Sequence, residues 1–531
     1  MMFISIIYRF FIDSMIKNCY NSYHNSFFRE VYFDLKPFIF ILLILLLTGC
    51  RTNQVVIEKD INSTALDYLM PMPVNLPDYC KTLNDTEFAK ELKRQTKINV
   101  NFRHYSSNAE VLTIISSGQL PDILEQNWLN FSGGPEHSIK NGYILKLNDI
   151  IENYSPNLKN YLDNNPDMKK AVMTSSGSYY AYPFIRSDKR LLTFTGLIVR
   201  SDILEELSLP VPVTINDWET ALRAFKQNGF DYPFVCKDIS ALLPFFGAFD
   251  VWPQFYNDNG SVKHGCFEPN YLTALETLSR WYSEGLIDPY YSTTNESTLN
   301  IYVLTGKSAA FTGYAGYTMG YIYDKDPSIK LAVAPYPIQN PGDEARFAIV
   351  DPHYSPQMAA AITTKCKDIV SAAALLDYGY GEKGHLLFNF GIENESYTMV
   401  DNKPVFTENV INNKQGLITR VAMALYHRGS YSGPFIQDFS TIEQYYNLPE
   451  QKECFEVWKN DAEKYLLPAF PDGDDMLELR NLYYNVLDHI NEQQIQFISG
   501  LRPLSELEKF KQELLEMGYD KLRSRLEGNI N

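Results

Sequence analysis

Residues 65–128 read ALDYLM PMPVNLPDYC KTLNDTEFAK ELKRQTKINV NFRHYSSNAE VLTIISSGQL PDILEQNW, and this stretch decides the fold. Segments with a strand pattern alternate in it with segments of helical periodicity, at 65–70, 84–96, 100–105, 110–117 and 120–124. This β-α-β-α-β order predicts an α/β protein that starts an open parallel sheet. Ligands of such sheets bind beyond the carboxyl ends of the strands.

The segment after the third predicted strand carries polar groups and an indole at that position. It contains Glu125, Asn127 and Trp128. We therefore expect these three residues to line a ligand site.

The rest of the chain continues the α/β pattern and then becomes helical. Strands are predicted at 196–200 and 330–335, and helices begin at Ser201, after the capping box of Thr214 and Asp217, and at 368. The segment 476–526 is almost entirely helical, with breaks near 500–503 and at 518. No internal repeat is present.

Composition and motifs exclude several classes of protein. The 531 residues are 45% hydrophobic, which argues against disorder, and the net charge of −17 makes nucleic acid a poor partner. The chain lacks C-x-x-C, H-E-x-x-H, a G-x-S-x-G elbow, a Walker A motif and a dinucleotide fingerprint. No enzyme activity, metal or cofactor is therefore predicted. A catalytic carboxylate pair is left open, because no spacing singles one out among the 64 Asp and Glu residues.

The N-terminal region carries an export signal. The apolar run 38–47 rises about 15 Å as a helix, too short for a hydrocarbon core roughly 30 Å thick, but suited to a signal peptide. Leu47-Thr48-Gly49-Cys50 resembles a bacterial lipobox, in which the cysteine sulfur takes a diacylglycerol. We expect residues 1–49 to be removed, Cys50 to be the lipid anchor and 50–63 to be a tether.

Two further expectations follow from the lipobox. The lipid would hold the protein at the extracytoplasmic face of the cell membrane. Residues 1–35 are unusually long for a signal peptide, so they indicate either a start codon assigned too early or a cytoplasmic extension. The five cysteines after Cys50 are predicted to be mostly buried free thiols, at 80, 236, 266, 366 and 454.

A series of motifs resembles family 1 extracellular solute-binding proteins, in family order. The matching segments are S-G-Q-L-P-D-I at 117–123, 142–158, Y-Y-A-Y-P at 179–183, 199–218, Y-S-E-G-L-I-D-P at 282–289, G-K-S-A-A-F at 306–311 and 391–398. The chain is most similar to the large lipoprotein sugar-binding proteins of Gram-positive bacteria. Many relatives carry an Asp/Asn/Gly-rich stretch suited to calcium, whereas 226–231 has few acidic oxygens, so calcium is not expected.

The resemblance implies a two-lobe, periplasmic-binding-protein-like fold with a hinge, a central cleft and a helical C-terminal region. Lobe 1 would comprise 64–190 and 331–400, and lobe 2 would comprise 191–330 and 401–531. The lobes would close over the ligand by a hinge motion, and a permease would bind the closed, monomeric protein.

Sugars present apolar C–H faces and hydroxyls, so their sites combine aromatic rings with polar side chains. The aromatic candidates are Trp128, Tyr182, Trp252, Tyr314, Tyr317 and Tyr354, and the polar ones are Glu125, Asn127 and Asp250. In the resemblance, Tyr314 and Tyr317 fall where maltose-binding proteins place a sugar-stacking ring. Tyr182 could instead pack between the lobes, and Trp218, Trp281 and Trp458 are predicted to be core residues.

These expectations favour one function and leave two alternatives. The favoured function is capture of a mono- or oligosaccharide for delivery to ABC permease subunits. The alternatives are a lipoprotein hydrolase that acts on glycans and a sensor or adhesin that binds a glycan without transport.

Overall fold

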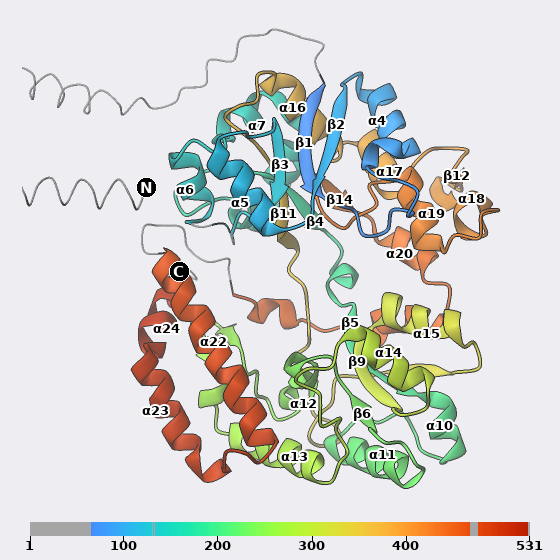
Figure 1. The fold of residues 1–531 in the computed structure, drawn as a ribbon, viewed down its shortest axis with the longest axis vertical. Coiled ribbons are helices and arrows are strands. Elements are labelled where there is room, and N and C mark those ends of the chain that lie inside the picture. Colours follow the sequence, from blue (N-terminus) through green and yellow to red (C-terminus); the bar gives the residue numbers. More distant parts are fainter. Residues whose placement is uncertain (1–64, 130, 132, 468–475, 529–531) are drawn as a thin grey trace, which may run out of the picture. The chain divides into compact units, whose positions relative to one another are not determined.

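Two separate β-sheets organise the computed structural model, which describes residues 65–129, 131, 133–467 and 476–528. The expected signal peptide, Cys50 and the tether lie outside these residues. Each sheet is covered by its own helices (Figure 1).

The first sheet has the strand order β14-β4-β11-β3-β1-β2. Its strands are β1 (Leu66–Pro71), β2 (Val100–Tyr105), β3 (Ile123–Gln126), β4 (Tyr182–Arg186), β11 (Tyr354–Ile362) and β14 (Phe435–Gln437). β11 is antiparallel to both of its neighbours, while the β1–β2, β1–β3 and β14–β4 pairs are parallel. Five strands therefore end at the same edge, and the β-α-β-α-β prediction is confirmed.

The first helix of this unit starts later than its periodicity predicts. α4 spans Glu87–Thr96, and the Thr86 hydroxyl caps it by accepting a hydrogen bond from the Ala89 N–H at 3.3 Å. Asn84 instead bonds the backbone of Phe102 in β2, donating to its carbonyl at 2.8 Å and accepting from its N–H at 2.9 Å. Asn84 thus ties the segment before the helix to the sheet.

Nine further helices belong with the first sheet in chain order. They are α5 (Asn108–Ser117), α6 (Gly134–Lys140), α7 (Asn148–Tyr154), α8 (Pro156–Asn164), α9 (Pro166–Ala171), α16 (Ile369–Tyr378), α17 (Glu382–Asn389), α18 (Glu408–Ile411) and α19 (Thr419–Tyr426). α20 (Phe439–Tyr445) leads out of this unit, and its Phe439 and Ile442 pack in the core of the second sheet. A hairpin of β12 (Tyr397–Val400) and β13 (Lys403–Phe406) lies among the later ones.

The second sheet has the order β10-β5-β9-β6, with β5 (Thr195–Arg200), β6 (Phe234–Val235), β9 (Ala310–Tyr314) and β10 (Leu331–Ala334). β5 is antiparallel to its neighbours, so β6, β9 and β10 all end at one edge. Its helices are α10 (Ser201–Glu206), α11 (Ile215–Gln227), α12 (Leu243–Gly247), α13 (Tyr271–Ser283), α14 (Glu296–Leu304), α15 (Gly320–Lys325) and α21 (Pro449–Val457), with a hairpin of β7 (Phe255–Asp258) and β8 (Ser261–His264).

The sheets correct the expected lobe boundaries in two places. β10 pairs with β5 rather than with the first sheet, and β14 pairs with β4 rather than with the second. The chain therefore crosses between the sheets at 187–194, at 335–353 and after 437. The first two crossings run alongside each other, because the Arg186 N–H donates to the His353 carbonyl and the Asp351 N–H to the Leu192 carbonyl, both at 2.8 Å.

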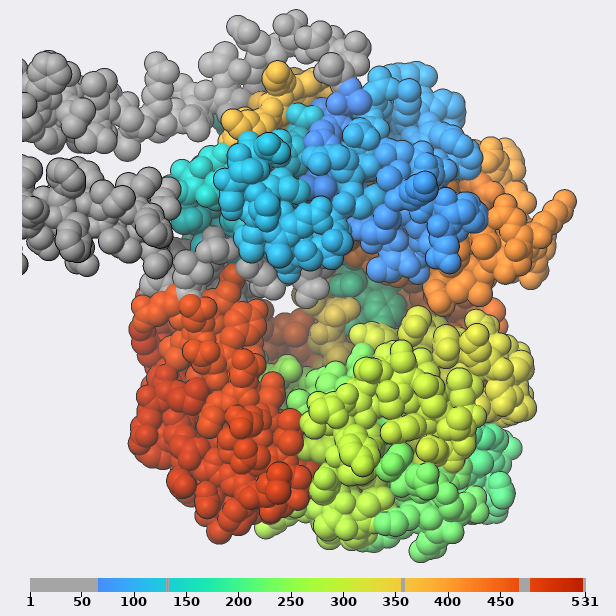
Figure 2. Space-filling model, in the orientation of Figure 1, coloured from blue at the N-terminus to red at the C-terminus, as the bar shows by residue number. Residues whose placement is uncertain are grey.

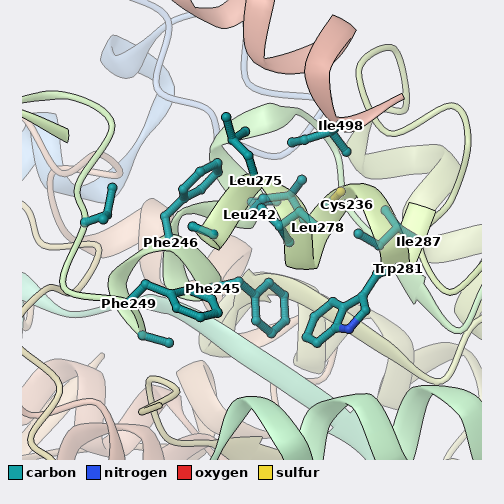
Figure 3. Packing of buried hydrophobic residues seen from close by; sticks show 14 of the residues in the cluster. Cys236, Leu242, Phe245, Phe246, Phe249, Leu275, Leu278, Trp281, Ile287 and Ile498 are labelled. Atoms are coloured by element: carbon teal, nitrogen blue, oxygen red, sulfur yellow. The ribbon is translucent and has the colours of Figure 1, made fainter. Parts of the chain in front are cut away.

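The C-terminal helices α22 (Met476–Ile498), α23 (Leu507–Met517) and α24 (Tyr519–Glu527) confirm the helical prediction and its breaks. They form one continuous red surface in Figure 2. α22 packs against α13 in the core of the second unit, where Ile498 joins Leu275 and Leu278 (Figure 3). The predicted core residues Trp218, Trp281 and Trp458 are fully buried.

Candidate ligand-binding site

A π-helical turn, Ala315–Met319, follows β9 at the carboxyl edge of the second sheet. Buried Ala315 and Met319 anchor it, which leaves Tyr314 41% and Tyr317 42% exposed. A side chain at Gly316 would come within 2.6 Å of the Tyr446 ring, so only glycine fits there. Turns of this kind occur often at functional sites.

Each of these two tyrosines has a cation beside its ring. Lys237, just beyond β6, places Nζ 4.4 Å from the Tyr314 ring centroid and also pairs with Glu296 at 3.5 Å. The Arg420 guanidinium, from α19, lies 5.3 Å from the Tyr317 centroid. Both distances are typical of cation–π contacts.

Glu296 connects Lys237 to the turn that carries Tyr314 and Tyr317. Its carboxylate accepts a hydrogen bond from the Thr318 hydroxyl at 2.6 Å, and the same hydroxyl accepts from the Tyr314 N–H at 3.1 Å. Tyr314 and Lys237 are thereby fixed to one carboxylate. The result is a pair of accessible rings set among charged hydrogen-bonding groups.

The edge of the first sheet does not present the indole that sequence predicts. Trp128 is fully buried, and its Nε1 donates to the Ala359 carbonyl at 3.0 Å. It packs against Phe131, with ring centroids 6.1 Å apart. The segment after β3 folds the ring back onto the sheet, so this structure does not expose Trp128 at the edge where a ligand is expected; Asn127 beside it is half-buried.

Glu125 belongs to a buried ion pair rather than to a loop. It lies in β3 with no exposed surface and pairs with Arg428, which follows α19. The carboxylate also accepts hydrogen bonds from the hydroxyls of Tyr68 at 2.7 Å and Ser432 at 2.9 Å. Burial and the neighbouring carboxylate raise the pKa of Tyr68 well above its usual value. No sequence signal could have paired Glu125 with Arg428, because 303 residues separate them.

Two further tyrosines predicted to bind ligand are buried. Tyr182 in β4 has no exposed surface, and its hydroxyl shares a hydrogen bond with Ser155 at 2.7 Å. Tyr354, at the start of β11, is 7% exposed, and its hydroxyl lies 2.5 Å from that of Tyr180. Both fill the interior of the first unit.

Asp250 and Trp252 lie elsewhere in the second unit. Trp252 is 9% exposed and stacks on Phe347, with centroids 5.5 Å apart and an interplanar angle of 14°. Asp250 adopts a left-handed φ of 58° and faces Arg346 at 3.3 Å, beside a cavity of about 140 Å³. These contacts fasten the crossing 335–353 to the second unit.

A cavity of about 330 Å³ lies among α7, α8 and α9, away from both strand edges described above. Its two lysines are already paired, because Asp163 lies 2.9 Å from Lys159 and 2.6 Å from Lys169. The lining of this cavity therefore offers no free cation to a ligand.

Sequence reasoning missed three residues near Tyr317. Arg420 lies in α19, Tyr431 follows that helix, and Tyr445 ends α20. The positive charge of Arg420 acts to lower the pKa of both tyrosine hydroxyls. Tyr431 is half exposed. No motif marked this segment, and only the fold brings it to the site.

The comparisons with known proteins agree with this architecture. The profile of the bacterial extracellular solute-binding proteins matches residues 82–385, and the chain belongs to that family. The fructooligosaccharide ABC transporter substrate-binding protein FusA of Streptococcus pneumoniae is 22% identical over 486 residues, which cover 84% of this chain and 87% of FusA. Lipoprotein LipO of Bacillus subtilis is 25% identical over 340 residues, which cover 60% of this chain and 64% of LipO.

The two-lobe fold is shared with solved solute-binding proteins. The structure of FusA in complex with kestose matches with a TM-score of 0.70 at 18% identity, over 88% of this chain and 99% of that one. The protein is thus an extracellular solute-binding protein with an α/β fold of two lobes. In the described part of the chain, every helix is too short or too polar to cross a bilayer. Those same residues contain no group of three or more His, Cys, Asp or Glu that could hold a metal ion.

Proposed function

We propose that this protein captures a carbohydrate outside the cell and delivers it to the permease of an ABC importer, acting as a monomeric binding protein and not as an enzyme. The observation that carries the proposal is the pair of half-exposed tyrosines, Tyr314 and Tyr317, among charged groups at a strand edge. The printed names of FusA and of the melibiose/raffinose/stachyose-binding protein MelE of Bacillus subtilis support the choice of carbohydrate.

The geometry suits sugar recognition. The tyrosine rings can stack on the C–H faces of a pyranose or furanose ring. Glu296 and Lys237 can bind its hydroxyls, since together they supply acceptors and donors. Because Arg420 belongs to the first unit and the tyrosines to the second, a ligand that contacts both would favour a closed arrangement of the lobes.

The lipid anchor at Cys50 is also part of the proposal. The lipobox and the similarity to LipO support it. A Cys50→Ala variant should lose incorporation of labelled fatty acid and should leave the membrane fraction. Continued labelling would disprove the assignment.

The test of the main proposal is a panel of mono- and oligosaccharides, screened by thermal shift on the purified protein. A ligand at 100 times its Kd adds about 2.7 kcal/mol to the free energy of unfolding, which raises Tm measurably. Hits are then titrated by calorimetry, checked for turnover by chromatography and examined by small-angle scattering. Binding without turnover, with compaction, is expected; turnover of the sugar, or no hit in the panel, would overturn the proposal.

A further inference from the structure

We propose that the saccharide bound at this site carries a carboxylate, as uronic and sialic acids do, and that Arg420 and Arg186 receive it. The inference rests on the proposed function and specifies its class of ligand. It is carried by two guanidinium groups of the first unit that are incompletely paired, of which Arg420 lies against the ring of Tyr317.

Arg420 differs from most arginines of the chain. In the described part, the guanidinium groups of many arginines pair with carboxylates: Arg94, Arg103, Arg190, Arg200, Arg223, Arg280, Arg346, Arg428, Arg502 and Arg523. Arg420 forms no ion pair with any described residue; it faces the Tyr317 ring and the Tyr445 hydroxyl instead. A guanidinium presents a planar fork of N–H groups that matches a carboxylate, so Arg420 is left with unused binding capacity.

Arg186, at the end of β4, adds a second guanidinium on the same side. Its side chain is 13% exposed, and its Nε is buried without a hydrogen-bond partner in the residues that the structure describes. Its one ion pair, to Asp351, is long at 3.4 Å, and Asp351 is 54% exposed. A ligand carboxylate could take the place of Asp351, because the guanidinium keeps its preference for a carboxylate partner.

Tyr431, in the segment after α19, offers a further polar group beside these arginines. Burial of its hydroxyl raises its pKa, and the positive charges of Arg186 and Arg420 oppose the rise. The protonated hydroxyl can donate a hydrogen bond to a carboxylate.

The remaining cation of the site is already balanced. Lys237 pairs with Glu296, so the Tyr314 side of the site is neutral overall and suited to hydroxyls. A ligand would therefore place its uncharged ring against Tyr314 and Tyr317 and its carboxylate toward Arg420. Substitution of Arg420 should therefore weaken binding of the ligand carboxylate, and substitution of Tyr314 or Tyr317 should weaken binding of the uncharged ring.

The experiment compares each acidic oligosaccharide with its neutral counterpart by calorimetry. The arms are oligogalacturonates and oligoglucuronates against their carboxyl-reduced forms, and sialyllactose against lactose, so that a uronate and a sialate source are distinguished. The variants are Arg420→Gln, Arg186→Gln and Arg420→Lys, with Arg103→Gln, an exposed pair on β2, as the matched control.

We expect an acidic member to bind at least ten times more tightly than its neutral form, with an affinity that falls as salt rises. Arg420→Gln should weaken acid binding about 10- to 100-fold and neutral binding less than about 3-fold, since it removes a charge-assisted hydrogen bond. Arg420→Lys should recover part of the loss, and Arg103→Gln should change neither. Tighter binding of neutral members would overturn this inference while leaving the proposed function intact; absence of binding by both kinds would overturn the proposed function itself.

Discussion

Aromatic residues are buried at the carboxyl edge of the first sheet and exposed at the carboxyl edge of the second. At the first sheet, Trp128 and Tyr354 turn inward and are at most 7% exposed, and Tyr182 at the start of β4 is buried too. At the second, the π-helical turn after β9 holds Tyr314 and Tyr317 outward, both above 40% exposed. The first unit contributes charge through Arg186, at the end of β4, and Arg420, in α19, whereas the second unit contributes rings.

This difference shows that position after a strand does not by itself expose a side chain. The segment after β3 returns over the sheet, and the indole of Trp128 finds a hydrogen-bond acceptor there, Ala359. The turn after β9 is anchored by buried Ala315 and Met319, and Gly316 lies against the ring of Tyr446, so that Tyr314 and Tyr317 remain outside the interior. The two regions therefore offer a ligand different groups, charged side chains from the first and aromatic rings from the second.

The largest effect is expected from breaking the buried ion pair of the first unit. Glu125→Ala would leave Arg428 buried without its carboxylate, which should lower the free energy of unfolding by about 3–5 kcal/mol. Asp67→Ala, which breaks the exposed pair with Arg103, should cost less than about 1 kcal/mol. Urea denaturation of both variants measures the contrast, and equal costs would mean that the buried pair does not organise this edge.

The second prediction concerns two buried indoles. Trp128→Phe removes a hydrogen bond, whereas the Nε1 of Trp218 has no partner in the described residues, so Trp218→Phe removes none. Both changes open a similar space, and Trp128→Phe should therefore cost about 0.5–1.5 kcal/mol more. Ligand affinity measured on the folded Trp128→Phe protein should stay within about twofold of wild type. A loss of binding free energy larger than the loss in the free energy of unfolding would show that Trp128 belongs to the ligand site.

The smallest effect is expected at a partly exposed cluster of the second unit. A hydrogen bond from Arg280, opposed by partial burial and assisted by Trp281, lowers the pKa of Glu219 from 4.5 to about 2. Because the folded pKa is depressed, this contribution is present above pH 4.5 and is lost as pH falls toward 2. Both arginine partners, Arg223 and Arg280, are over 40% exposed, so screening limits the contribution to about 1 kcal/mol.

Glu219→Gln tests that contribution. The variant should flatten the acid side of the stability curve, measured by urea midpoints between pH 6 and pH 3.5. An unchanged slope would show that the cluster contributes nothing in solution.

Local sequence predicted the elements of the fold well, because each carries its own periodicity and caps. The capping box of Thr214 and Asp217 starts α11 as predicted, and Gly118 ends α5 with a φ of 70°. The lobe boundaries were less predictable, since β10 and β14 are short strands whose partners lie far away in sequence. The residues within about four positions of either strand do not indicate which sheet that strand joins.

The candidate site was predictable only where the resemblance supplied it. Tyr314 and Tyr317 emerged from their place in the family pattern, and the structure leaves them exposed. The reversal at Trp128 depended on the acceptor at Ala359, 231 residues away. Arg420 and Tyr431 reach the site through the packing of α19 and the loop after it, which no local pattern reveals.

The most direct test of the account is a calorimetric titration of the Tyr314→Ala/Tyr317→Ala double variant with a sugar found in the screen. Truncating an aromatic anchor costs about 2–4 kcal/mol, so the double variant should bind at least about 30-fold more weakly than wild type while its unfolding midpoint is unchanged. Tyr484→Ala on α22, where the ring is 44% exposed, is the control and should bind like wild type. Binding by the double variant within about threefold of wild type would contradict the claim that the aromatic edge of the second sheet holds the ligand.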